Sequence, residues 1–272
     1  MRDRAPVWKS IIGVLLGLVI VFPVLYAFSI SLMPESFIAA YPPKILPSAP
    51  TLENYAKALK TAPMLRFVLN SAIVAVSIMG VQVLTSSLAA YAFVNFEFRG
   101  KGLLFGAVLA TMMIPGEAIL ISNYLTVASA RLLDSYWGLI LPYGASAMGV
   151  FLMRQQFLTV PREFREAATM DGCTDWRFFW RILMPVSMPA ISALAVYCFI
   201  NTWNQYMWPL LITSSVTMRT VQIGISMLSF SDGMAYGVIM AGFMLILLPS
   251  LVIFILGQQK MVSGLMAGSV KG

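Results

Sequence analysis

Residues 161–185 have the sequence PREFREAATMDGCTDWRFFWRILMP, which is the one long polar segment in the second half of an otherwise apolar chain. Its charged residues are Arg162, Glu163, Arg165, Glu166, Asp171, Asp175, Arg177 and Arg181. A charged side chain at the centre of a membrane helix costs about 2.5–3.5 kcal/mol on insertion scales, so a segment with this many charges does not cross a bilayer. We predict that it lies in water or along the membrane surface.

Local signals divide this segment into two short helices. Pro161 suits the first turn of a helix, and Glu163 lies near the positive N-terminal end of the first one. Gly172 can adopt the left-handed conformation that ends this helix. Thr174 can cap a second helix, and we expect Pro185 to end it.

Each predicted helix has a defined face. In the first, the residues at positions i, i+3, i+4 and i+7 are Phe164, Ala167, Ala168 and Asp171. This face is mostly small and apolar, so another surface can approach it closely, and Glu166 beside it offers a carboxylate to a basic partner. In the second helix, an apolar stripe at helical spacing consists of Trp176, Phe179, Trp180 and Leu183.

The spacing within the segment resembles a known motif. Glu166-Ala167-Ala168 is followed after three residues by Gly172, and after nine more by Ile182-Leu183-Met184-Pro185. This arrangement is similar to the EAA loop of permease subunits of ATP-binding-cassette (ABC) importers, with Met184 where leucine is usual. In that family the loop is a coupling helix, which docks into a cleft on the ATP-hydrolysing subunit.

The resemblance implies a set of residues that couple the chain to an ATPase: Arg162, Glu163, Arg165, Glu166, Ala167, Ala168, Asp171, Gly172 and Pro185. Glu166 would pair with a basic group of the ATPase, Ala167 and Ala168 would allow close packing, and Gly172 would permit the sharp exit. The alternative is an amphipathic surface helix without a partner, which explains the two small alanines poorly.

Composition excludes several classes of protein. The chain has 272 residues, of which 59% are hydrophobic and 11% charged, so it is not a soluble globular domain. The net charge of +7 is scattered between apolar runs, which argues against nucleic-acid binding. Histidine is absent, and Cys173 and Cys198 are not closely spaced, so we predict no metal site and interpret both cysteines as packing residues.

The sequence also contains no nucleotide-binding loop. Gly100-Lys101 lacks both the preceding glycine spacing and the following serine or threonine of a Walker A motif. We therefore predict a chain with no catalytic residues and no cofactor of its own. If ATP drives this protein, ATP and Mg²⁺ bind to partner subunits.

Apolar runs predict an all-α integral membrane protein with six transmembrane helices, at residues 11–31, 67–93, 103–121, 136–157, 186–210 and 236–256. The first run lacks a convincing cleavage site, so we expect a retained span rather than a signal peptide. Pro115-Gly116 interrupts the third run. The remaining parts are the N-terminus (1–10), a loop (32–66) with a short helix starting near 51–55, the coupling loop (161–185) within the permease core (67–262), and a C-terminal tail (263–272).

The distribution of basic residues predicts the orientation. With both termini in the cytoplasm, 12 basic residues lie inside and 6 outside, and four of those six lie in loop 32–66. The positive-inside rule favours this topology, with loop 32–66 extracytoplasmic. It also places residues 161–185 in the cytoplasm, so we predict a protein of the bacterial cytoplasmic (inner) membrane.

Other segments resemble the carbohydrate branch of these permeases. They are Asn70-Ser71, Ala90-Tyr91-Ala92-Phe93, Phe98-Arg99-Gly100, the stretch from Leu133 to Leu139, and the stretch from Trp203 to Leu210. The last is especially similar to sn-glycerol-3-phosphate permease subunits, and many oligosaccharide permeases carry near relatives of it. The resemblance implies the transmembrane fold of a type I importer, a second permease subunit, two ATPase subunits, an extracytoplasmic binding protein, and surrounding lipid.

Polar residues inside apolar runs are candidates for a translocation pathway. Asn201, Asn204, Gln205 and Trp208 lie at i, i+3, i+4 and i+7, which predicts one helical face, and Tyr206 adjoins it. Alternatively, the amides bond neighbouring helices, and Trp203, Tyr206 and Trp208 form an aromatic belt. We expect Trp208 to belong to the belt under either interpretation.

Glu117 is a further pathway candidate, because ionisable groups in membrane segments are often functional, unless the helix breaks at Pro115 and exposes it to water. In maltose-type relatives the loop that corresponds to residues 213–233 reaches toward the docked binding protein, and the resemblance implies the same role here. The alternative is that this loop is a solvated connector without a partner.

Together these observations predict a permease subunit of an ABC importer for a carbohydrate or a polyol phosphate, with sn-glycerol-3-phosphate or an oligosaccharide as the specific hypothesis. One alternative is a transporter driven by an ion gradient, for which Glu117 is the only plausible intramembrane coupling residue. Another is an ABC permease for a different solute.

Overall fold

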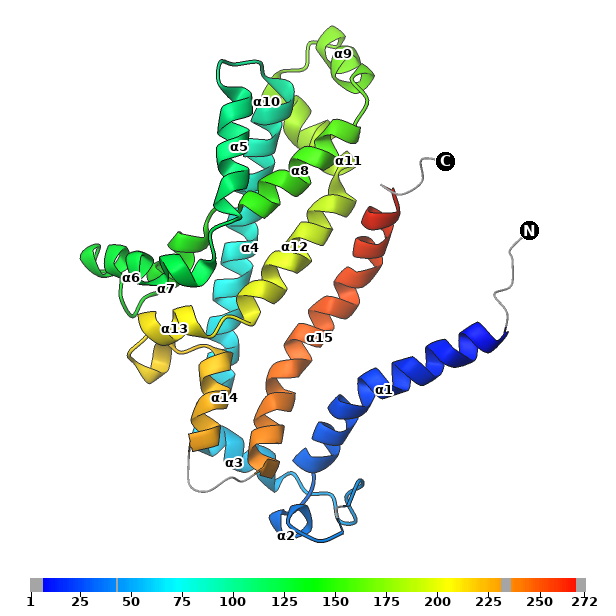
Figure 1. The fold of residues 1–272 in the computed structure, drawn as a ribbon, viewed down its shortest axis with the longest axis vertical. Helices are drawn as coiled ribbons and strands as arrows, with labels where there is room; N and C mark the ends of the chain where they lie inside the picture. Colours follow the sequence, from blue (N-terminus) through cyan, green and yellow to red (C-terminus); the bar gives the residue numbers. More distant parts are fainter. Residues whose placement is uncertain (1–6, 43, 231–235, 268–272) are drawn as a thin grey trace. The chain divides into compact units, whose positions relative to one another are not determined.

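The computed structural model describes residues 7–42, 44–230 and 236–267 (Figure 1). Within these ranges the chain forms helices joined by turns and contains no strand, so the predicted all-α class is confirmed. The outer parts of the predicted termini (1–10 and 263–272) and the end of loop 213–233 fall outside the described residues.

The chain divides into two compact units, residues 1–66 with 224–249 and residues 67–223 with 250–272. The first unit contains α1 (Val7–Ser31), α2 (Glu35–Ile38) and α3 (Glu53–Thr61), with parts of α14 (Val221–Phe230) and α15 (Tyr236–Ala267). Asn54 on α3 donates hydrogen bonds to the carbonyl oxygens of Ser31 (3.0 Å) and Met33 (2.7 Å). These bonds fasten α3 to the end of α1, within the predicted loop 32–66.

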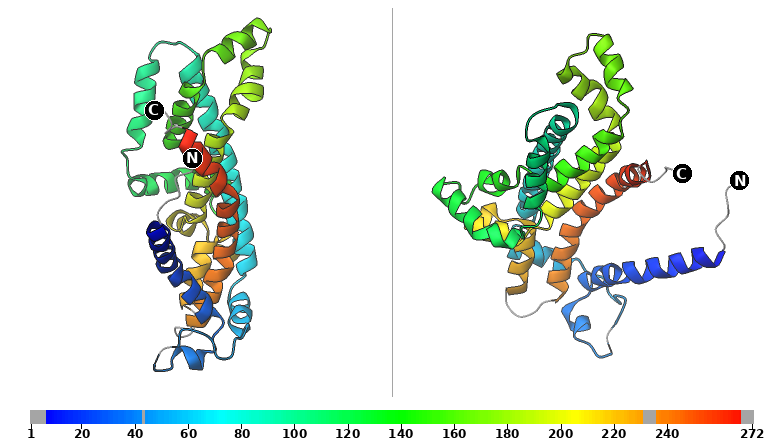
Figure 2. Two further views of the ribbon diagram at one scale, coloured as in Figure 1. Left: turned by 90° about the vertical axis from the view of Figure 1, so that its right-hand side faces the viewer. Right: turned by 45° about the horizontal axis from the view of Figure 1, so that its top comes forward.

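The second unit is built along α4 (Met64–Asn95), a helix of 32 residues and therefore about 48 Å long. Two shorter helices, α8 (Ala147–Thr159) and α12 (Met188–Trp203), pack against it at an angle (Figures 1 and 2). Toward the C-terminal end of α4 the buried residues of this unit include Ala90, Tyr91, Met153, Phe157, Phe179, Leu183 and Leu194. This cluster joins α4, α8 and α12 to the segment that follows Pro161.

A second buried cluster lies toward the other end of α4. It joins α4 to α6 (Leu120–Ser129), α7 (Tyr136–Ile140) and α13 (Met207–Ile212). Trp208 belongs to this cluster and is only 2% exposed, and Trp203 is equally buried in α12. The expectation that Trp208 belongs to an aromatic belt at the membrane interface was therefore wrong, and the alternative that also placed Trp203 in this belt is contradicted too, because both rings pack inside the protein.

Three of the predicted spans are broken helices. The chain bends by 93° between α5 (Lys101–Thr111) and residues Gly116–Ser129, by 49° between Tyr136–Tyr143 and α8, and by 79° between Asp175–Val186 and α12. The predicted break at Pro115-Gly116 is confirmed. Residues 186–210, predicted as one span, do not form one continuous helix, because α12 ends at Trp203 and α13 starts at Met207.

Side chains of α4 satisfy the backbone at the break between α7 and α8. Gln82 donates a hydrogen bond to the carbonyl oxygen of Tyr143 (2.7 Å), and Thr85 donates to that of Gly144 (2.9 Å). The thiol of Cys198 on α12 donates to the other end of the Gln82 amide (2.9 Å). A carbonyl freed inside an apolar bundle is costly unless it is bonded, so these contacts stabilise the bend.

In the second unit, hydrogen bonds join the loop before α7 to the loop after α13, at the end of the unit that lies away from α9. The carboxylate of Asp134 accepts hydrogen bonds from the backbone N–H groups of Ser214 and Ser215, both at 3.1 Å. Burial would raise the pKa of Asp134, but the bonds from Ser215 and Ser214 outweigh it and leave this pKa below its ordinary value. Asn70 on α4 donates to the carbonyl oxygens of Thr217 (2.8 Å) and Arg219 (2.9 Å).

Two helices of the described residues are long and apolar enough to cross a membrane, Ile11–Ser31 and Met64–Asn95. The number rises to five if each bent pair forms one span, and the apolar stretch Tyr236–Val252 in α15 is shorter than a typical span. The count of six spans therefore remains a prediction.

Candidate functional site

The polar segment folds into α9 (Glu163–Met170), and its end has the geometry expected from the sequence. Gly172 has a positive φ of 71°, which a residue without Cβ adopts readily. Cys173 N–H bonds to Ala168 C=O (2.8 Å), and Gly172 N–H bonds to Thr169 C=O (3.0 Å). This pair of bonds is the Schellman arrangement, so the prediction that Gly172 ends the helix is confirmed.

The second helix begins where the sequence predicts but ends differently. Thr174 caps α10 (Asp175–Phe178) by accepting a hydrogen bond from the N–H of Arg177 (3.3 Å). The helix continues through a wider π turn at Phe179–Leu183 and through α11 (Met184–Val186), so Pro185 does not end it. The chain then bends at Ser187 into α12, which connects the polar segment directly to the bundle.

Only half of the predicted apolar stripe of this second helix is buried. Phe179 and Leu183 pack in the core, whereas Trp176 is 63% and Trp180 40% exposed. The prediction assumed α-helical spacing throughout, and the π turn changes that spacing. The two tryptophans make an edge-to-face contact with each other on the surface, with ring centroids 5.6 Å apart.

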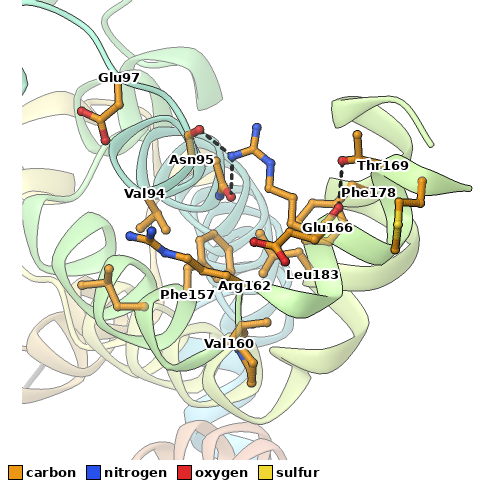
Figure 3. Close-up of a pocket in the computed structure, with 14 residues that line it drawn as sticks. Val94, Asn95, Glu97, Phe157, Val160, Arg162, Glu166, Thr169, Phe178 and Leu183 are labelled. Atoms are coloured by element: carbon orange, nitrogen blue, oxygen red, sulfur yellow. Dashed lines mark hydrogen bonds between the residues drawn. The ribbon is translucent and has the colours of Figure 1, made fainter. Parts of the chain in front are cut away.

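Arg165 anchors α9 to the end of α4. Its Nη1 donates to the carbonyl oxygen of Asn95 (2.6 Å) and to Asn95 Oδ1 (3.3 Å), shown as dashed lines in Figure 3. Its Nη2 forms an ion pair with Asp175 Oδ1 (3.1 Å), and Tyr91 Oη donates to the carbonyl oxygen of Asp175 (3.1 Å). One guanidinium therefore connects three helices, α4, α9 and α10.

A partly open cavity of about 720 Å³ lies between α9 and the ends of α4 and α8. Arg162, Arg165 and Glu166 line it together with Asn95 and Phe157. Figure 3 shows the side chains of Arg162 and Glu166 reaching toward the same space, across from Asn95. Among the described residues, the Glu166 carboxylate has no hydrogen-bond or ion-pair partner, so it is available to a basic group from outside.

The predicted coupling residues differ in accessibility. Those exposed in the chain are Arg162, Glu163, Glu166, Ala167, Asp171, Gly172 and Pro185. Ala168 is only 5% exposed and belongs to the buried cluster with Phe178 and Leu183, so the expectation that it allows a partner to pack closely is wrong. Its small side chain instead lets α9 lie close to its own bundle, while Ala167 keeps the outward position.

The proposed pathway residues do not share a helical face. Because α12 ends at Trp203, Asn204 and Gln205 lie in the turn before α13, and Trp208 lies in α13. Asn201 and Asn204 donate to carbonyl oxygens of their own helix, those of Tyr197 (2.8 Å) and Ile200 (2.9 Å).

The remaining pathway candidates have different surroundings. Asn204 Oδ1 also accepts a hydrogen bond from the side chain of Gln222 on α14 (3.3 Å). This contact agrees with the alternative interpretation, in which the amides bond neighbouring helices. Asn201, Asn204 and Tyr206 are exposed, and Gln205 is partly exposed. Glu117 is exposed in the 3-10 turn Gly116–Ile119 that follows the predicted break. A role of these residues in translocation stays a prediction.

Comparison with known proteins identifies the family. The family described as binding-protein-dependent transport system inner membrane component matches residues 82–259, which is more than half of the chain. The chain belongs to this family. It is therefore an integral inner-membrane permease subunit of the ABC transporter class, which confirms the resemblance seen in its sequence.

Named relatives of the permease cover almost its full length. An sn-glycerol-3-phosphate transport system permease protein of Shigella flexneri is 37% identical over 97% of this chain and 98% of its own. The protein of the same description from Yersinia pestis is 39% identical over 94% of this chain and 92% of its own. A solved bacterial ABC transporter for the import of the acidic polysaccharide alginate has the same fold, with a TM-score of 0.83 at 20% identity over 95% of this chain and 99% of its own.

Sequence reasoning missed two groups of residues in this permease. Asn95 forms the other side of the cavity, and Gln82 with Thr85 supports the broken helix pair. Asn95 lies 70 residues from its partner Arg165, so no local spacing connects them. For Gln82 a signal existed, because an amide inside an apolar helix requires a hydrogen-bond partner.

Arg165→Ala is expected to loosen α9 without unfolding the permease. The change removes the bonds to Asn95 and Asp175, and because the Arg165 side chain is 35% exposed we expect a loss of about 1 kcal/mol in unfolding free energy. Hydrogen exchange of the amides of α9 should accelerate by about fivefold, as follows from that energy if α9 opens locally. Arg162→Ala is the control, since Arg162 lies on the same cavity but is exposed. Equal exchange rates in both variants and the wild type would contradict an anchoring role.

Proposed function

We propose that this permease imports a polyol phosphate or carbohydrate, with sn-glycerol-3-phosphate as the first candidate. The observation that carries this proposal is its similarity to sn-glycerol-3-phosphate permease proteins at 37–39% identity over 94–97% of the chain. A likeness of this extent covers the loops and the helix breaks as well as the long helices. An oligosaccharide is the second candidate within the same class.

The proposed assembly contains a second permease subunit, two ATPase subunits and an extracytoplasmic binding protein. In this assembly the chain has six spans with both termini in the cytoplasm. The segment predicted as loop 213–233, of which residues 221–230 form α14, faces the binding protein. ATP and Mg²⁺ belong to the ATPase subunits, and the chain contributes no catalytic group. Support comes from the family's description as a component of a binding-protein-dependent system and from the placement of basic residues in the sequence.

In the proposed coupling step, α9 docks into a cleft of the ATPase, and Glu166 pairs with a basic group there. Two connections support transmission of its movement. Arg165 ties α9 to the end of α4, and the helix from Asp175 to Val186 continues through the bend at Ser187 into α12. A displacement of α9 on ATP binding is therefore passed to two long helices at once, which would tilt them and open the bundle outward.

Uptake by proteoliposomes that contain the complete importer tests this function. We expect labelled sn-glycerol-3-phosphate to enter only when ATP is enclosed and the binding protein is present, and a protonophore to leave the rate unchanged. Labelled maltodextrin is the competing substrate. Uptake of maltodextrin alone would reassign the substrate to the oligosaccharide candidate. Uptake that is abolished by the protonophore and independent of ATP would contradict the importer mechanism.

A further inference from the structure

Arg154 on α8 combines a partly buried side chain with the lack of an acidic partner among the described residues. Its guanidinium carbon lies 4.3 Å from the centre of the Phe105 ring on α5. Its Nε is buried and has no hydrogen-bond acceptor within the described residues. By contrast, Lys101 pairs with Glu97 (3.0 Å) and Arg165 with Asp175 (3.1 Å).

Aromatic side chains surround the apolar side of this guanidinium. Phe105 makes an edge-to-face contact with Phe93 on α4, with ring centroids 5.4 Å apart, and Phe93 lies 6.1 Å from Phe98. A guanidinium stacks well on a ring face, which orients it while leaving its planar N–H groups free to bind an anion. Phe105 therefore fixes the direction of Arg154 but does not neutralise its charge.

Arg154 and Phe105 lie close to the ends of their helices, beside exposed apolar side chains. Arg154 lies five residues before the end of α8 at Thr159, and Phe105 lies four residues after the start of α5 at Lys101, which places both about 6–8 Å inside the helix ends. The neighbouring apolar side chains of Leu103 and Leu104 on α5 and Leu158 on α8 are 81%, 53% and 52% exposed. Apolar surface of this kind in a membrane protein contacts acyl chains, so the guanidinium lies where those chains meet their phosphates.

We propose that Arg154, oriented by Phe105, binds the phosphate group of an anionic phospholipid between α5 and α8. A charge in this position is costly without a counter-ion, and a phosphate offers the paired oxygens that fit the guanidinium fork. Phosphatidylglycerol fits better than a choline lipid, because its phosphate carries no attached cation that competes with Arg154. Basic pockets between membrane helices commonly bind such headgroups.

The test uses the intact importer purified in mild detergent, with phosphatidylglycerol, phosphatidylcholine or inorganic phosphate added. Native mass spectrometry counts bound lipid, and thermal unfolding measures stabilisation. We expect Arg154→Gln to weaken phosphatidylglycerol binding by about tenfold, as the loss of one charged hydrogen-bonded pair predicts. Arg154→Lys should restore part of it, because lysine keeps the charge but lacks the fork. Arg181→Gln, which removes an exposed arginine outside α8, is the matched control and should bind like the wild type.

Several outcomes would overturn the proposal. Equal phosphatidylglycerol binding by the wild type and Arg154→Gln would show that Arg154 is not the ligand. Equal stabilisation by inorganic phosphate would assign the site to a free anion rather than a lipid. If Arg154→Gln released a partner subunit while lipid binding stayed constant, the counter-ion would be a carboxylate of that subunit.

Discussion

Glu166→Lys is expected to abolish ATP-dependent uptake while the permease still folds and inserts. Glu166 is exposed on α9 and lines the cavity, and among the described residues its carboxylate has no partner within the chain, so its replacement disturbs no internal contact. At the proposed interface, however, the change replaces an attractive charge pair by a repulsive one. Like charges at an interface cost several kcal/mol, which corresponds to docking weakened by about a hundredfold or more.

The measurement compares uptake with ATP hydrolysis in the same proteoliposomes. In Glu166→Lys we expect hydrolysis to lose its stimulation by the loaded binding protein, together with the loss of uptake. Glu35→Lys is the charge-matched control, because Glu35 is exposed on α2, outside the coupling segment. Wild-type uptake by Glu166→Lys, or equal losses in both variants, would contradict the specific role of Glu166.

Gly138→Ala is expected to lower the unfolding free energy of the permease by about 3 kcal/mol, the upper end of the range for overpacked cores. A Cβ at Gly138 would collide with the carbonyl oxygen of Leu132 and would also lie 3.1 Å from Val127 Cγ1 and 3.2 Å from Ile212 Cγ2. A backbone oxygen cannot rotate away as a flexible side chain can. The loop before α7 must therefore shift, and it carries Asp134 with it.

Thermal unfolding of the detergent-purified permease measures this effect. Gly106→Ala on α5 is the control, since no atom lies within 4 Å of the position of its added Cβ. Alanine is the better helix former, so the control should be neutral or slightly stabilising. Similar unfolding temperatures for the two variants would show that the packing at Gly138 is looser than the structure indicates.

Local rules predicted the coupling segment well because its determinants are close in sequence. The charge content kept residues 161–185 from being assigned as a span, and Gly172 and Thr174 end and start helices within a few residues of each other. Such signals act through the backbone of neighbouring residues, so they survive in any tertiary context. The family was also accessible from the sequence, because its motif lies in this same segment.

Contacts between distant residues were not predictable in this way. The periodic pattern across Asn201, Asn204 and Trp208 assumed one continuous helix, and the end of α12 at Trp203 invalidated it. The burial of Trp208 depends on packing against α4 and α7, which no window of one helix contains. Likewise, Pro115 indicated that a helix breaks, but the 93° turn depends on where the following helix packs.

The wide turn at Phe179–Leu183 has a consequence for how α9 is aimed. In an ordinary α-helix each residue advances the chain by about 100° around the axis, and a π turn takes up one residue more before the next carbonyl is reached. The extra residue is therefore accommodated within one turn, and deleting a single residue there would convert the π turn into an ordinary α turn. Residues on its N-terminal side, α9 included, would keep nearly the same rotational orientation about the axis of that helix. The π turn thus allows the segment between Gly172 and Pro185 to hold one residue more than a regular helix would, without changing the direction in which α9 points.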